Sequence, residues 1–328
     1  MKKFVILTLF IGLLTLMVSC QRKTVAESSK ETDDQWIAVT DQKSQQILVF
    51  DPAKEGMEEK EVWDKQDAEW TWSPTDENGF AGLLDGWGHP SDVTLREIDG
   101  EQYMAVTDSY GFVGIVPYPA GDQRTWGLNI GLSPHAAEIL PDGNIAVALS
   151  SSPGSIRIYT SSEGADSEEF AEYLLPGAHG VVWDPEKELL WALGTNFLVA
   201  LEIKGTSSDP RIEEVHREQT PTSGGHNLSV VYGDTDKLWV TTVTNVYQYS
   251  KSKKAWITDY PGVDDINKEN VKSIGNQLSG QVVLTQQKES VGENKFTTDT
   301  IDFYLPTNPK EIKDAEMYKA RIWSTSYQ

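Results

Sequence analysis

The chain has 328 residues, a formal net charge of −22 and a single cysteine, Cys20. So acidic a surface repels the phosphate backbone of nucleic acids, and we expect no nucleic acid partner. One cysteine cannot form an intrachain disulfide or a multi-cysteine metal site.

The first 19 residues have the features of a bacterial lipoprotein signal peptide. Two lysines precede an apolar run over residues 4–18, which is short for a membrane-spanning helix and typical of a secretion signal. Ser19, a small residue, then precedes Cys20 as in a lipobox. We therefore predict cleavage of residues 1–19 and acylation of Cys20, which would anchor the protein to a membrane. The alternative is an ordinary signal peptide with an incidental cysteine.

Residues 20–34 are predicted to be a flexible tether. They are polar and lack aromatic side chains, so they cannot bury enough apolar surface to fold. Gln21, rather than Asp, follows Cys20, which in bacteria with two membranes favours sorting to the outer membrane. We expect a lipid-anchored protein of the cell envelope.

Six related units occupy residues 35–328, each with two short apolar runs. The first runs are Trp36–Asp41, Tyr103–Asp108, Asn144–Leu149, Leu190–Gly194, Lys237–Thr241 and Gln281–Thr285, and the second runs are Gln46–Phe50, Phe112–Val116, Ser155–Tyr159, Phe197–Leu201, Asn245–Tyr249 and Thr300–Tyr304. β-Branched and aromatic residues dominate these runs, as in β-strands. From the second unit onward the spacing is typical of a four-stranded blade. We predict an all-β fold, a single six-bladed β-propeller, in which Met317–Tyr327 completes the N-terminal blade.

Four of the five histidines occupy one position in successive repeats. They are His89, His135, His179 and His226, separated by 44–47 residues, and each lies just before the first strand of its predicted blade. In a propeller that strand lines the central channel, so the four imidazoles should meet at one mouth. Lys272 has the matching position in the sixth blade and should join these four histidines in one ring of side chains.

The ring is compatible with a metal site. Neutral imidazole is a common ligand of transition metals, and His135, His179 and His226 could bind Zn or Mn with an open position. Glu138, three residues after His135, could be a fourth ligand or could orient a ligand.

The ring is equally compatible with a metal-free site. His89, Lys272 and Arg321 could hold an anionic ligand by charge-assisted hydrogen bonds, and an imidazole could transfer protons in catalysis. The histidines could also be structural, because in WD-type propellers such an imidazole bonds an aspartate in a turn of its own blade. Asp108 could serve His89 in this way, whereas the blades of the other three histidines offer no such aspartate.

Several segments resemble a family of uncharacterised bacterial β-propeller lipoproteins, classed as a domain of unknown function. They are Trp70–Trp72, Pro134–Gly143, Ala178–Asp184, Leu190–Gly194, Gly225–Leu228, Val271–Ser273 and Tyr318–Arg321. The resemblance implies a six-bladed propeller and carries no established activity. His89 fits the pattern less clearly than the other three ring histidines.

These patterns together predict a cell-envelope lipoprotein that binds a small or carbohydrate ligand at a His-lined channel mouth, with or without a metal ion. One alternative is a metal-assisted polysaccharide lyase or hydrolase that acts on acidic glycans. The other is a protein-interaction scaffold whose histidines are structural. The sequence leaves open whether the protein is an enzyme.

Overall fold

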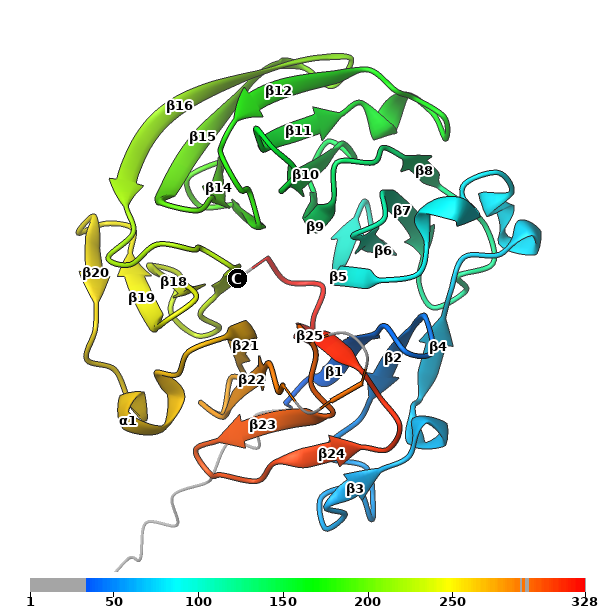
Figure 1. Ribbon diagram of the computed structural model, residues 1–328. Helices are drawn as coiled ribbons and strands as arrows, with labels where there is room; N and C mark the ends of the chain where they lie inside the picture. Colours follow the sequence, from blue (N-terminus) through cyan, green and yellow to red (C-terminus); the bar gives the residue numbers. More distant parts are fainter. Residues whose placement is uncertain (1–33, 290, 293–294, 328) are drawn as a thin grey trace, which may run out of the picture. The chain divides into compact units, whose positions relative to one another are not determined.

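The computed structural model describes residues 34–289, 291–292 and 295–327. Their strands form six sheets arranged in a ring, a six-bladed β-propeller, as the repeats predicted (Figure 1). The predicted signal peptide, Cys20 and residues 21–33 of the predicted tether lie outside the described residues. Within the described ranges, no helix is long and apolar enough to cross a membrane.

Each blade has four main strands, which follow one another from the channel outward. Blade I contains β25 (Met317–Trp323), β1 (Trp36–Asp41), β2 (Gln46–Phe50) and β4 (Trp70–Trp72). Blade II contains β5 (Pro90–Ile98), β6 (Glu101–Asp108), β7 (Phe112–Pro117) and β8 (Trp126–Asn129), and blade III contains β9 (Pro134–Ile139), β10 (Ile145–Leu149), β11 (Ser155–Tyr159) and β12 (Phe170–Leu174).

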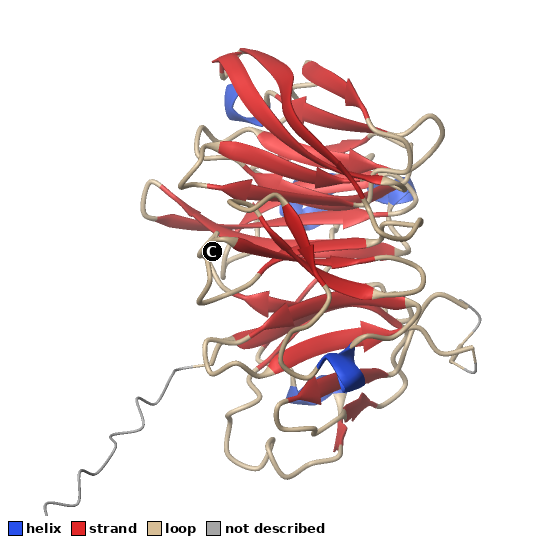
Figure 2. Ribbon diagram, turned by 90° about the vertical axis from the view of Figure 1, so that its left-hand side faces the viewer, coloured by secondary structure: helices blue, strands red, loops and turns tan. Residues whose placement is uncertain are grey.

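The remaining blades follow the same order. Blade IV contains β13 (Gly180–Asp184), β14 (Leu189–Leu193), β15 (Phe197–Thr206) and β16 (Asp209–Gln219), and blade V contains β17 (Asn227–Val230), β18 (Lys237–Thr241), β19 (Val246–Ser250) and β20 (Ala255–Ile257). Blade VI contains β21 (Val271–Asn276), β22 (Val282–Gln286), β23 (Thr300–Tyr304) and β24 (Lys310–Ile312), with β3 (Val62–Trp63) at its outer edge. Helical turns are short: η1 (Lys65–Asp67), η2 (Asp76–Phe80), η3 (Leu84–Gly86), η4 (Ser161–Glu163) and α1 (Val263–Ile266) (Figure 2).

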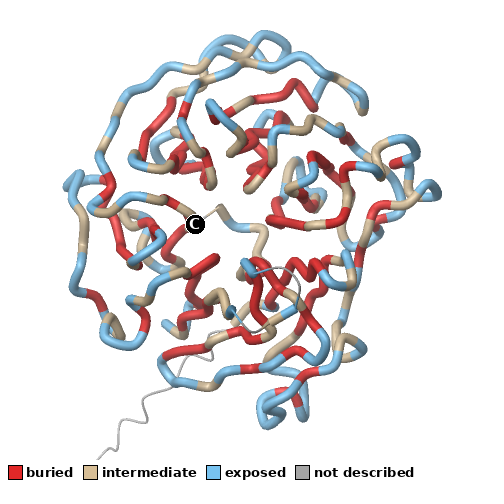
Figure 3. Tube along the Cα trace, viewed as in Figure 1, coloured by how far each residue is buried: buried red, intermediate tan, exposed pale blue. Residues whose placement is uncertain are grey.

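The two apolar runs of each repeat are the second and third strands of a blade. The first runs fall on β1, β6, β10, β14, β18 and β22, and the second runs fall on β2, β7, β11, β15, β19 and β23. These middle strands are buried on both faces, because each blade packs between two others. Their sequences are therefore almost continuously apolar. In the outer strands β12 and β16, by contrast, exposed residues alternate with partly buried ones over most of the strand (Figure 3).

The chain closes the ring by joining its two ends. β25 is the innermost strand of blade I and pairs antiparallel with β1, with Ile37 opposite Ile322 and Val39 opposite Ala320. The predicted role of the C-terminal segment is confirmed. A second connection is made at the rim, where β3 pairs in parallel with β24. Blades I and VI thus each contain strands from both ends of the described chain.

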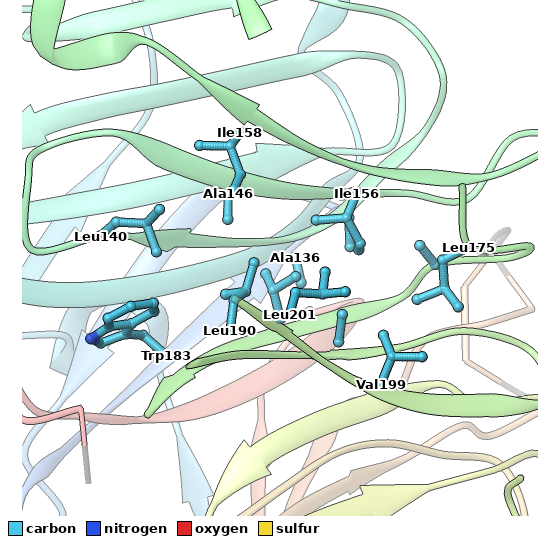
Figure 4. Close-up of a cluster of buried hydrophobic side chains, with 14 residues drawn as sticks. Ala136, Leu140, Ala146, Ile156, Ile158, Leu175, Trp183, Leu190, Val199 and Leu201 are labelled. Atoms are coloured by element: carbon cyan, nitrogen blue, oxygen red, sulfur yellow. The ribbon is translucent and has the colours of Figure 1, made fainter. Parts of the chain in front are cut away.

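The hydrophobic core consists of one cluster between each pair of neighbouring blades. Alternate residues of a strand enter different clusters: Ile37 and Val39 face blade VI, and Ala38 faces blade II. Figure 4 shows the cluster between blades III and IV, to which blade III contributes Leu140 and Ile156 and blade IV contributes Trp183 and Leu190.

The C-terminal tail after β25 lies at the end of the channel opposite to the histidines, and Figure 1 shows it at the centre of the ring. The Tyr327 hydroxyl donates to the Ile139 carbonyl at the far end of β9 (2.9 Å). The Arg96 guanidinium lies 4.8 Å from the centre of the Tyr327 ring. Tyr232, beyond the far end of β17, donates to the Ser326 carbonyl (3.3 Å). The tail therefore covers this end of the channel.

Candidate functional site

Six side chains, one from each blade, meet at the near end of the channel. They are His89, His135, His179, His226, Lys272 and Tyr318, which we call the ring, and they line a cavity of about 620 Å³. Each lies at or just before the start of an innermost strand. Because blades are related by rotation about one axis, the same strand position brings the side chains to the same height.

The backbone hydrogen bonds of the ring histidines repeat from one blade to the next as well. The His179 amide donates to the Leu193 carbonyl (2.8 Å), and the His226 amide donates to the Thr241 carbonyl (2.9 Å). Both histidines therefore continue the pairing of the inner strand with the second strand. This shared ladder position places the backbones of the two histidines at equivalent points of their blades.

His135, His179 and His226 form a continuous row. The ring centres of His135 and His179 are 4.3 Å apart, and those of His179 and His226 are 5.0 Å apart. His135 Nδ1 lies 2.9 Å from the Ser133 carbonyl oxygen, and His179 Nδ1 lies 2.8 Å from the Gly177 carbonyl oxygen. A carbonyl oxygen can only accept, so Nδ1 carries the proton in both residues and Nε2 keeps a lone pair.

The third histidine of this row, His226, also contacts two further members of the ring, Lys272 and Tyr318. His226 Nε2 lies 2.8 Å from Lys272 Nζ and 3.3 Å from the Tyr318 hydroxyl. Lys272 Nζ also lies 5.2 Å from the centre of the Phe296 ring, a cation–π contact. His226 thus accepts a hydrogen bond from the lysine ammonium group.

Burial keeps the imidazoles neutral. It lowers the pKa of His135 and of His226 well below the ordinary value of 6.5, and it lowers the pKa of His179 to about 4. Burial also lowers the pKa of Lys272 to about 8, so most of this lysine stays charged at pH 7. The site therefore combines uncharged hydrogen-bond acceptors with one cation.

A charged cluster lies directly beneath the ring. Lys319 Nζ donates to the His135 carbonyl (2.7 Å) and pairs with Asp92 Oδ2 (2.9 Å). Arg321 pairs with both oxygens of Asp92 (2.7 and 2.6 Å) and donates to Asn227 Oδ1 (2.6 Å). Arg321 is thus at the floor of the site rather than among the ring side chains.

The structure does not bring Glu138 to the predicted metal ligands. Its carboxylate forms a two-bonded ion pair with Arg96 (2.6 and 2.7 Å) and lines a separate cavity of about 50 Å³ on the far side of the charged cluster. Within the described part of the chain, no group of three or more His, Cys, Asp or Glu side chains is placed to hold a metal ion. Metal binding by the three histidines stays a prediction.

His89 lies at the side of the site. Its ring stacks on Tyr110 at 4.3 Å, and its Nε2 lies 3.0 Å from the Tyr110 hydroxyl. The Asp108 carboxylate accepts from the backbone amides of Gly88 and Tyr110 at 2.8 Å each. Asp108 therefore holds the turn around His89 through the backbone, and the imidazole is left to line the cavity.

Sequence reasoning missed several residues of this site, among them Tyr318, Lys319 and Asp92. Tyr318 follows Met317 as Lys272 follows Val271, so aligning β25 with β21 would have placed Tyr318 in the ring. No comparable pattern marks the pairing of Lys319 with Asp92, because these residues lie 227 positions apart.

The arrangement has three chemical capabilities. The Nε2 lone pairs of His135 and His179 can accept hydrogen bonds from hydroxyl groups or bind a metal ion. Lys272 can pair with an anion. The contact between Lys272 and His226 provides a route for proton transfer.

The sequence also matches a described family. DUF6528, a family of unknown function, matches residues 1–324. The chain belongs to this family. Membership of DUF6528 agrees with the predicted resemblance to a domain of unknown function and assigns no activity.

Solved structures with a similar fold are distant in sequence. A protein of unknown function from Bacteroides caccae aligns with a TM-score of 0.52 and 12% identity over 87% of this chain and 94% of its own chain. A luciferin-regenerating enzyme aligns with a TM-score of 0.48 and 10% identity over 90% and 89% of the two chains. No curated protein matches the sequence. For this member of DUF6528, the similarity to the Bacteroides caccae protein speaks to the fold alone.

Proposed function

We propose that this protein is a cell-envelope lipoprotein whose propeller binds a small hydroxylated ligand, such as a carbohydrate, in the cavity of the ring. The observation that carries the proposal is the convergence of one polar ring side chain from every blade on a single cavity. Its volume of about 620 Å³ is within the range typical of small-molecule sites.

The polar groups of the ring suit a ligand with several hydroxyl groups. His135 and His179 offer acceptors at Nε2, since both donate their Nδ1 protons to backbone carbonyls. Phe296 and Tyr318 line the same cavity and offer apolar ring faces to the carbon atoms of a sugar. The C-terminal tail covers the opposite end of the channel, so a ligand would enter from the ring side.

The test is calorimetric titration of the purified protein with a panel of neutral and acidic monosaccharides and their short oligomers. We expect His179→Ala to weaken binding of any ligand found by about 10-fold or more, because one buried hydrogen bond is lost. His216→Ala is the matched control: His216 contacts Tyr249 in the outer part of blades IV and V, away from the cavity. Equal weakening by both substitutions, or no ligand in the panel, would contradict the proposal.

A metal ion is the second candidate for this cavity. The Nδ1 hydrogen bonds of His135 and His179 are the arrangement usual for metal-bound histidines. The Lys272 ammonium group, 2.8 Å from His226 Nε2, opposes a cation at the third imidazole. Elemental analysis after loading with Zn or Mn, beside a variant with all three histidines replaced by alanine, tests this candidate. Equal metal content in the two proteins would rule it out.

A further inference from the structure

Positive charge exceeds negative charge in the buried channel. Three cationic side chains lie there on the inner strands of blades VI and I: Lys272 and Lys319, which are 6% and 0% exposed, and Arg321, whose side chain is 11% exposed. Among the described residues, Asp92 is the only carboxylate that forms an ion pair with any of them. The channel therefore has an excess of two positive charges in a protein whose net charge is −22.

The neighbouring acidic groups do not balance this excess. Glu138 pairs with Arg96 through both oxygens, so that pair is neutral as a unit. Asp108 accepts from backbone amides within blade II. Glu316 lies near His89 in a second pocket, which Lys43 and Lys295 also line.

A buried cation without a counterion is destabilising, so its presence needs an explanation. Lys251 shows the ordinary solution elsewhere in this fold: it is 8% exposed and pairs with the buried Asp184. The ammonium group of Lys251 thus contacts a carboxylate, whereas that of Lys272 contacts the neutral imidazole of His226. Its ammonium group lines the cavity, where a bound molecule can reach it.

We propose that the ligand of this cavity is an anion, specifically a sugar acid whose carboxylate pairs with Lys272 while its hydroxyl groups donate to the imidazoles. This inference rests on the proposed function and adds the ligand's charge to it. The carboxylate supplies the counterion that the described channel lacks. Lys319 and Arg321 add a favourable potential from below while they stay paired with Asp92.

The experiment compares D-glucuronate, D-glucose and inorganic phosphate as probes in calorimetric titrations of the wild-type protein. Glucuronate and glucose differ in one carboxylate, so the comparison isolates the charge. We expect glucuronate to bind about 10- to 100-fold more tightly than glucose, the range for one buried charge-assisted hydrogen bond. We expect Lys272→Met to remove this preference, so that the variant binds glucuronate no more tightly than glucose.

Two further variants complete the design. Lys253→Met removes an exposed lysine from the turn between β19 and β20 and should have no effect. Lys272→Arg keeps the charge and should retain part of the preference for glucuronate. The comparison of glucuronate with glucose uses the wild-type protein alone. It therefore tests the anion inference even if a Lys272 variant misfolds.

The outcomes separate the two proposals. Equal binding of glucose and glucuronate, or tighter binding of glucose, overturns the anion inference and leaves the proposed function intact. Binding of phosphate alone, lost in Lys272→Met, supports an anion site and overturns its assignment to sugars. Binding of none of the three probes overturns the sugar-acid inference, while the wider panel of saccharides still tests the proposed function.

Discussion

Three adjacent imidazoles are the residue-level feature that defines this site. Neutral imidazoles can lie 4.3–5.0 Å apart without electrostatic repulsion, whereas charged ones would repel each other strongly in a buried environment. The hydrogen bonds from Nδ1 of His135 and His179 add a second constraint, because they set the tautomer. Burial and tautomer together decide that these residues act as acceptors.

The first prediction concerns acid stability. Burial holds the pKa of His179 at about 4 in the folded protein, below 6.5 in the unfolded chain, so the unfolded chain binds more protons between these pH values. This contribution to stability is complete above about pH 6.5 and is lost as the pH falls towards 4. We expect His179→Asn to make the free energy of unfolding less dependent on pH in this window, as measured by urea denaturation.

Comparison of the variant with the wild type is essential, because Asp108 has the opposite effect. Burial raises the pKa of Asp108 to about 6, so this group stabilises the folded state as the pH falls below 6. The Asp108 contribution is common to both proteins and cancels in the difference. An unchanged pH dependence in His179→Asn would show that His179 titrates normally.

The second prediction concerns the membrane anchor. If Cys20 is acylated, Cys20→Ala should leave the protein unacylated, and the protein should move from the membrane fraction to the soluble fraction of the cell envelope. Fractionation with mass spectrometry of the N-terminal peptide measures both changes. Retention of the variant in the membrane at the wild-type level would contradict the lipobox prediction.

At the scale of elements, the inner strands approach one another closely just below the ring. A Cβ atom on Gly180, the first residue of β13, would lie 2.6 Å from Leu228 Cβ on β17. This is well inside van der Waals contact, so no side chain fits between these strands. The glycine thereby permits the spacing that brings His179 and His226 to 5.0 Å.

The third prediction follows from this contact. Gly180→Ala should lower the free energy of unfolding by about 1–3 kcal/mol, the usual cost of overpacking, and it should weaken ligand binding because the two histidines move apart. Thermal unfolding and calorimetric titration measure these effects. Gly275→Ala on β21 is the control, since its Cβ would lie 3.2 Å from a single side-chain atom of Ile322. Equal effects of the two substitutions would contradict the explanation.

For the whole molecule, the described C-terminal residues both close the ring and cover the far end of the channel. β25 supplies the inner strand of blade I, and the tail beyond it contacts residues of blades II, III and V. The tail thus spans the axis and connects blades that do not all touch one another.

The fourth prediction separates these two roles. Truncation after Trp323 keeps β25 and removes the contacts of Tyr327 and Ser326, so the propeller should fold with stability reduced by about 1–3 kcal/mol. Truncation before Met317 removes β25 and should prevent cooperative folding. Calorimetric unfolding of the two proteins measures the difference. Unchanged stability after the shorter truncation would show that the tail contributes nothing.

The repeat pattern was sufficient to predict much of this protein, because rotation about one axis converts equal spacing in sequence into equal position in space. It identified the middle strands of all six blades, the closing role of Met317–Tyr327 and the convergence of His135, His179 and His226. It also placed Lys272 correctly from its position alone. These features depend on local periodicity, which each repeat carries in its own residues.

Only the tertiary structure decided how the charged residues are paired. Glu138 has the right spacing to join His135, yet Arg96 of the neighbouring blade binds it, and Arg321 pairs with Asp92 instead of lining the cavity. Each of these partners comes from a different blade and lies 42 to 229 positions away in the chain. A buried charge takes the opposite charge that packing brings within reach, and such partners do not follow the repeat period.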